Sequence, residues 1–117
     1  MARGSLLLVD DDEISSQILG YILVDEDYAV DAAATGGAAL DKVKTNDYDL
    51  VFLDYMLPDM RGHEVAKRMR VLKPGIKIIF LTGYTRDEDT PEDLFEKILL
   101  KPVPPDIIVK AIKDTLG

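Results

Sequence analysis

Four short, uninterrupted apolar runs constrain the fold of this chain more than any other feature of its sequence. The runs cover residues 6–9, 50–53, 78–81 and 98–100. Runs of this length, bounded by turn residues, are typical of strands that are buried on both faces, as in a parallel sheet. The polar residues that follow them are Asp10, Asp54, Thr82 and Lys101. Because ligands bind beyond the carboxyl ends of the strands in open α/β sheets, we expect these four side chains at one functional edge.

Strand-like and helical patterns alternate along the chain. We predict strands over residues 5–10, 29–33, 49–54, 76–82 and 98–100, and helices over 13–24, 37–45, 62–72 and 105–116. Thr90, Pro91 and the two acids after them are typical of a helix start, which predicts a short fourth helix over 91–97. Alternation with right-handed crossovers predicts an α/β fold with helices on both faces of a five-stranded parallel sheet.

The first predicted helix carries an apolar stripe. Ile14, Ile18 and Ile22 recur at helical spacing, and Leu19 and Leu23 lie beside them. We expect these five side chains to form the buried face of the helix.

The composition is typical of a single globular domain. The 117 residues are 47% hydrophobic and 31% charged, and the net charge of −8 argues against nucleic-acid binding, which needs a basic surface. The sequence contains no cysteine, no signal-peptide pattern and no apolar stretch near the ~20 residues of a membrane span. We therefore expect a cytoplasmic protein without direct membrane contact: one domain over 1–117, with its core over about 5–116 and no output domain.

The carboxylates that follow the first and third strands predict a metal site. Two carboxylates ~4 Å apart repel by about 4 kcal/mol at the effective dielectric of a protein surface. Asp10, Asp11 and Asp54 would therefore need more positive charge than Lys101 supplies, and Mg²⁺ is the natural addition to a set of oxygen ligands. One carboxylate could then attack a phosphoryl group, with the cation, Lys101 and the hydroxyl of Thr82 sharing its oxygens.

Four motifs together resemble the receiver domain of two-component response regulators. They are Leu7 to Glu13 with its three aspartates, Asp54 followed by Pro58 and Gly62, Leu81-Thr82-Gly83, and Lys101-Pro102. The resemblance covers nearly the whole chain, and the motifs come in the family's order. It implies a flavodoxin-like three-layer sandwich with strand order 2-1-3-4-5.

The resemblance also implies roles for the site residues. Asp54 would be the phospho-acceptor, and Thr82 and Lys101 would bind the phosphoryl group. Mg²⁺ would be held by the carboxylates of Asp11 and Asp54 and the main-chain carbonyl of Met56, with Asp10 contributing largely through water. The Lys101–Pro102 peptide bond would be cis.

The phosphoryl donor implied by the resemblance is a phosphohistidine of a sensor histidine kinase or of a histidine phosphotransfer domain. The protein would catalyse only its own phosphorylation and dephosphorylation, so it would not be an enzyme in the ordinary sense. We expect a monomer or a weak dimer.

The sequence departs from the family's pattern in two places. Ile98 occupies the position, three residues before the lysine, where many receivers carry an aromatic switch residue. The segment from Thr82 to Lys101 is also roughly three residues shorter than usual. These departures cast doubt on the usual dimerisation surface, and they favour a receiver attached to or serving a hybrid kinase.

Other interpretations of the same residues remain open. Taken alone, Asp10 and Asp11 could be turn or cap residues, and Thr82 or Lys101 could be ordinary residues at a strand end. Asp12 is expected to cap the first helix. A haloacid dehalogenase-type hydrolase would need a second aspartate two residues after Asp54, where this chain has Met56. A flavodoxin-like FMN binder would need a phosphate-binding loop after the first strand, where this chain has the acidic run Asp10 to Glu13. The main alternative is an interaction module of the same fold that is not phosphorylated.

Overall fold

A computed structural model describes residues 3–83 and 95–116, which form five strands and four helices. The strands are β1 (Gly4–Val9), β2 (Tyr28–Ala33), β3 (Leu50–Asp54), β4 (Ile78–Thr82) and β5 (Lys97–Leu100). The helices are α1 (Glu13–Asp25), α2 (Gly36–Thr45), α3 (Gly62–Leu72) and α4 (Pro105–Leu116). No helix among these residues is long and apolar enough to cross a membrane.

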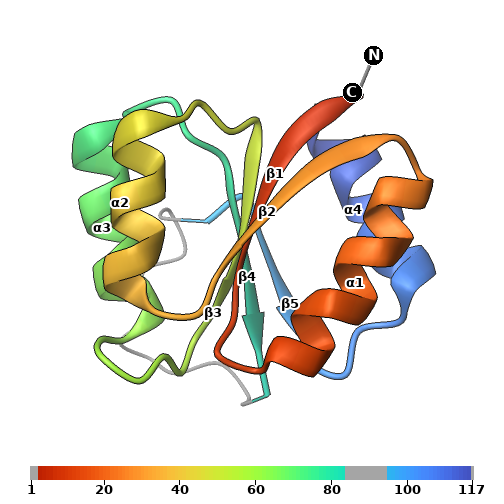
Figure 1. The fold of residues 1–117 in the computed structure, drawn as a ribbon, viewed down its shortest axis with the longest axis horizontal. Coiled ribbons are helices and arrows are strands. Elements are labelled where there is room, and N and C mark those ends of the chain that lie inside the picture. Colours follow the sequence, from red (N-terminus) through yellow and green to blue (C-terminus); the bar gives the residue numbers. More distant parts are fainter. Residues whose placement is uncertain (1–2, 84–94, 117) are drawn as a thin grey trace.

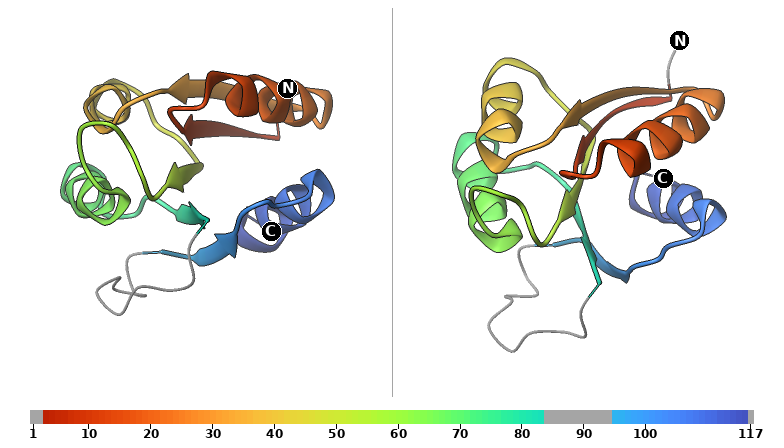
Figure 2. Two further views of the ribbon diagram at one scale, coloured as in Figure 1. Left: turned by 90° about the horizontal axis from the view of Figure 1, so that it is seen from below. Right: turned by 60° about the horizontal axis from the view of Figure 1, so that its bottom comes forward.

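The strands form one parallel sheet in the order β2-β1-β3-β4-β5, which confirms the predicted topology. Helices α2 and α3 cover one face of the sheet, and α1 and α4 cover the other (Figures 1 and 2). The carboxyl ends of the central strands therefore open toward the same edge, between the two helical layers.

The core lies on both faces of the sheet, as the apolar runs of β1, β3 and β4 predict. The run over residues 98–100 was expected to be buried in the same way, but β5 lies at the edge of the sheet, and Leu100 is 56% exposed. Every residue of β3 and β4 is buried. Val51, Leu53 and Phe80 belong to the cluster under α2 and α3, whereas Phe52 and Ile79 belong to the cluster under α1 and α4. Successive residues of each strand thus serve opposite faces, so the end of each strand is held rigidly from both sides.

Helix α1 begins as predicted but packs differently. The side chain of Asp12 accepts hydrogen bonds from the backbone N–H groups of Ile14 and Ser15, and so caps the helix. The predicted buried stripe is wrong in part: Leu23 is buried, but Ile14 and Ile18 are 71% and 56% exposed. Both stay largely exposed, because a helix with apolar residues over a wide arc of its surface cannot bury all of them against one layer.

The short helix predicted over 91–97 falls mostly outside the described residues. Within the described part, residues 95 and 96 are not helical and Lys97 already begins β5. Phe95 is buried, and its ring stacks on Phe80 with centroids 4.4 Å apart.

Candidate functional site

The sheet register brings the polar ends of three strands to one edge. Asp54, the last residue of β3, is paired with Leu81 on β4, so Thr82 lies one residue beyond it. Thr82 is in turn paired with Leu100, the last residue of β5, and Lys101 follows at once. The backbone N–H of Lys101 donates to the carbonyl oxygen of Thr82 over 2.7 Å. This alignment follows from parallel pairing, in which all strands end on the same side.

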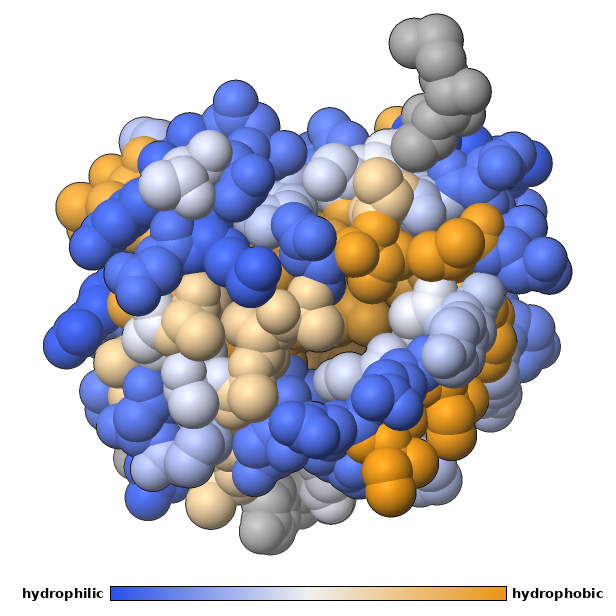
Figure 3. All heavy atoms as spheres, viewed as in Figure 1, coloured by the Kyte–Doolittle hydropathy of each residue, from blue (hydrophilic) through white to orange (hydrophobic). Residues whose placement is uncertain are grey.

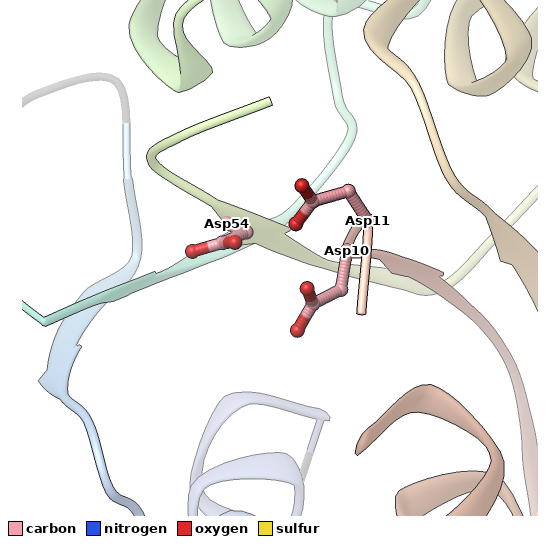
Figure 4. Close-up of side chains that lie close together, drawn as sticks. All are labelled: Asp10, Asp11 and Asp54. Carbon is pink, nitrogen blue, oxygen red and sulfur yellow. The ribbon is translucent and has the colours of Figure 1, made fainter. Parts of the chain in front are cut away.

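Three carboxylates converge between the ends of β1 and β3. Asp10 and Asp11 follow β1, Asp54 ends β3, and oxygens of all three lie within 4.8 Å of one another. Figure 4 shows the three side chains reaching into the same space. Asp54 is buried, Asp10 is partly buried and Asp11 is exposed, so the cluster runs from the interior to the surface. The structure thus brings together the acidic residues that the sequence singled out.

Lys101 bridges two of these carboxylates. Its Nζ lies 3.2 Å from Oδ2 of Asp10 and 3.2 Å from Oδ1 of Asp54. The other oxygen of Asp10 accepts a hydrogen bond from the backbone N–H of Asp12, and Oδ1 of Asp54 also accepts one from Tyr55. Both oxygens of Asp10 are therefore engaged. Among the described residues, the contacts of Asp54 with Lys101 and with the N–H of Tyr55 are both made by its Oδ1.

Burial and charge act against each other at this site. Burial raises the pKa of Asp54, the charge and hydrogen bond of Lys101 lower it, and the resulting pKa lies above the usual value. For Lys101, burial lowers the pKa, but the charges of Asp54 and Asp10 together raise it above its usual value. The lysine is therefore held firmly as a cation, while burial disfavours the ionised form of Asp54 in the absence of further positive charge.

The remaining predicted residues lie around this cluster. Thr82 is buried at the end of β4. Met56 lies in the loop after β3, where it forms an isolated antiparallel bridge with Arg61, and its side chain is half exposed. The Lys101–Pro102 peptide bond is cis, as predicted. His63, for which no role was predicted, lies beside the ring of Tyr55, with centroids 6.4 Å apart.

Residues at this edge fit a hard divalent cation such as Mg²⁺. Among the described residues, three carboxylates face the ammonium group of Lys101, so negative charge is in excess. The ligand atoms are all oxygens, which Mg²⁺ prefers. Asp11 and Asp54 would hold the ion directly, and Asp10, whose two oxygens accept from Asp12 and Lys101, would contribute largely through water. Added positive charge would also relieve the cost of ionising the buried Asp54.

An apolar groove opens beside the acidic cluster, between α1 and α4. It has a volume of about 520 Å³. Its lining includes Ile18 and Leu19 of α1, Val103 and Ile108, together with Asp10 and Lys101 of the site. On the face shown in Figure 3, hydrophobic residues gather mainly over the half of the molecule that carries α1. The exposed Ile18 thus forms part of an apolar surface next to the site.

Sequence reasoning missed one residue of the loop that follows β3. The carboxylate of Asp59 accepts hydrogen bonds from the backbone N–H groups of Gly36 and Gly37, over 2.8 and 2.9 Å, at the start of α2. An aspartate between a proline and a methionine is ordinary in a loop, and its partners lie more than twenty residues away in the sequence. No local signal could have identified the contact.

Solved structures of receiver domains have the same fold. A CheY-like response regulator receiver domain protein from Methanospirillum hungatei superimposes with a TM-score of 0.92 and 35% identity, covering 96% of this chain and 92% of that one. Response regulator protein TrrA from Thermotoga maritima, solved in complex with Mg²⁺-BeF, has a TM-score of 0.88 and 33% identity, covering 99% of this chain and all of that one.

Curated relatives extend the similarity to complete regulators. Transcriptional regulatory protein CreB of Escherichia coli is 33% identical over 76% of this chain and 39% of its own length. DltR of Streptococcus agalactiae is 39% identical over 72% of this chain and 38% of its own length. The chain thus matches well under half the length of each relative. The family model described as the response regulator receiver domain matches residues 6–113. The chain therefore belongs to the response regulator receiver domain family and serves in phosphorelay signal transduction.

Proposed function

We propose that Asp54 is the residue that accepts the phosphoryl group. A carboxylate oxygen of Asp54 attacks the phosphorus of a phosphohistidine, the P–N bond breaks, and an aspartyl phosphate and a free imidazole result. The observation that carries this assignment is the position of the buried Asp54, which contacts Lys101 and lies beside the other two carboxylates. Its Oδ1 is occupied by Lys101 and the N–H of Tyr55, which points to Oδ2 as the attacking atom.

The neighbouring groups would stabilise the charge of the transferred phosphoryl group. Lys101 supplies a fixed positive charge, and the hydroxyl of Thr82 would donate a hydrogen bond to a phosphoryl oxygen. Mg²⁺, held by Asp11, Asp54 and the carbonyl oxygen of Met56, would offset the negative charge of the phosphoryl oxygens and favour the ionised form of Asp54. The Mg²⁺-BeF complex of the similar protein TrrA supports this part of the proposal.

The proposed donor is a histidine kinase or a histidine phosphotransfer domain. The apolar groove beside Lys101 supports a protein donor, because a small phosphate compound would not need it. We further propose a cytoplasmic, monomeric or weakly dimeric single domain that makes no direct contact with nucleic acid or membrane. That the domain serves a hybrid kinase stays a prediction.

An interaction module that is never phosphorylated is not favoured. Such a module would have no need to bury an aspartate whose pKa burial raises, or to place Lys101 against two carboxylates. An ion cluster of this kind costs desolvation energy, and hydrophobic packing would serve a purely structural role better.

Intact mass spectrometry would test the assignment directly. The protein is incubated with acetyl phosphate and Mg²⁺, and one phosphoryl mass should be added. Asp54→Asn should abolish the addition, whereas Asp41→Asn, which alters an exposed aspartate on α2, should leave it unchanged. Full labelling of the Asp54→Asn protein would overturn the assignment. Omitting Mg²⁺ should also prevent labelling, and labelling at the same rate in EDTA would refute the metal requirement.

A further inference from the structure

We infer that Asp59 is a positioning residue for the metal site: by binding the start of α2, it holds the loop that carries Met56. This inference rests on the proposed function, because Met56 contributes to the site only through the metal. The carboxylate of Asp59 is bidentate, with Oδ1 accepting from Gly36 and Oδ2 from Gly37. A charged acceptor with two partners is a strong restraint on a loop residue.

The loop that Asp59 anchors is short and closed at its base. The N–H of Gly62 donates to the carbonyl oxygen of Tyr55 over 2.8 Å, and Met56 bridges to Arg61 one residue further in. The guanidinium of Arg61 also donates to the hydroxyl of Tyr55 over 3.1 Å and lies over its ring. These contacts fix the two ends of residues 56–61 but not the tip. The tip is held by the hydrogen bonds of Asp59 and by the packing of Leu57 and Met60 against the core cluster under α2 and α3.

Close packing of the loop on the start of α2 makes the contact of Asp59 depend on where the loop lies. A Cβ placed on Gly36 would lie 2.5 Å from Cγ of Met60, so the loop residue next to Asp59 presses directly on the start of α2. Met60 also packs against the core cluster under α2 and α3. The loop and the helix start therefore fit closely, and a loop released from Asp59 could move away from Gly36 only by losing this packing.

The simpler explanation is that Asp59 merely caps α2. The helix already has a cap residue: Oγ1 of Thr35 accepts from the N–H of Ala38 over 3.0 Å. Thr35 and Asp59 therefore satisfy different N–H groups at the same helix end, but only Asp59 belongs to the loop. This difference separates a capping role from a positioning role.

The test compares Mg²⁺ binding by calorimetry in the parent, Asp59→Ala and the matched control Thr35→Ala. Both substitutions should lower the melting temperature, because each removes an acceptor from the start of α2. Only Asp59→Ala should weaken Mg²⁺ binding, by about 10-fold, the usual effect of losing a group that orients a metal ligand. Asp59→Asn, which keeps one acceptor oxygen, should bind Mg²⁺ with an intermediate affinity. This variant replaces Asp59→Ala in the comparison if Asp59→Ala fails to fold.

Amide hydrogen exchange without metal provides a second readout. The amides of residues 56–61 should exchange faster in Asp59→Ala than in the parent, and at the parent rate in Thr35→Ala. Parent affinity in Asp59→Ala, or an equal loss in Thr35→Ala, would overturn the positioning role alone. A parent protein that bound no Mg²⁺ would overturn this inference and the metal part of the proposed function together.

Discussion

Gly62 lies so close to the ring of Phe80 that a larger residue at position 62 would clash with that ring. A Cβ added to Gly62 would lie 2.6 Å from Cε1 of Phe80 and 2.8 Å from the carbonyl oxygen of Asp54. Gly62 begins α3 directly beneath the end of β3, so its small size lets the helix start against the strand that carries Asp54.

Gly62→Ala should therefore destabilise the protein by overpacking, by about 1–3 kcal/mol. Gly20→Ala is the matched control, because nothing lies within 4 Å of a Cβ added at Gly20 of α1. Since alanine has the higher helix propensity, that change should stabilise the protein by up to about 1 kcal/mol. Urea denaturation of both variants checks the opposite signs, and a Gly62→Ala protein as stable as the parent would contradict the close packing.

The stacked pair of Phe80 and Phe95 should contribute strongly to stability. The ring of Phe95 is 7% exposed and nearly parallel to that of Phe80, at an interplanar angle of 22°. Phe95→Ala should lower the free energy of unfolding by about 3 kcal/mol. Leu100→Ala, which truncates a side chain that is 56% exposed, should change it by less than about 0.5 kcal/mol. Similar losses in the two variants would refute the role of the stack.

The contact of Asp59 with α2 should depend on pH. Hydrogen bonds from Gly37 and Gly36 lower the pKa of Asp59 below its usual value of 3.8. A lowered folded-state pKa contributes stability above the unfolded pKa, and this contribution is lost as the pH falls through the folded value. The stability deficit of Asp59→Ala relative to the parent should thus be full at neutral pH and shrink below 3.8. The deficit of Thr35→Ala, which has no titrating group, should stay constant, and a constant deficit in both would rule out the linkage.

The groove between α1 and α4 should affect the rate of phosphotransfer from a protein donor but not from a small-molecule donor. Ile18→Glu would place a charge on the apolar surface beside Lys101, and should slow phosphotransfer from a phosphohistidine protein at least several-fold. Labelling by acetyl phosphate should be unaffected. Val71→Glu, at a position 82% exposed on α3 in the other helical layer, is the control and should alter neither rate. Equal effects on both donors would show that the substitution disturbs the site itself.

Much of the fold could be predicted because its signals are local. Unbroken apolar runs identified β1, β3 and β4, and helical periodicity with the cap at Asp12 identified α1 and its start. The acidic cluster was predictable for a related reason, since parallel strands must end on the same side and so bring Asp10 and Asp54 together.

By itself, then, the sequence determined the five strands and the four helices that the structure describes, and which polar residues gather at one edge of the sheet. Only the tertiary structure decided which apolar face of α1 is buried, that Phe95 stacks on Phe80, and that Asp59 reaches the start of α2. The physical reason is the range of the interactions. Periodicity and capping act within one or two turns, whereas burial and the choice of hydrogen-bond partner depend on segments brought together only when the layers pack.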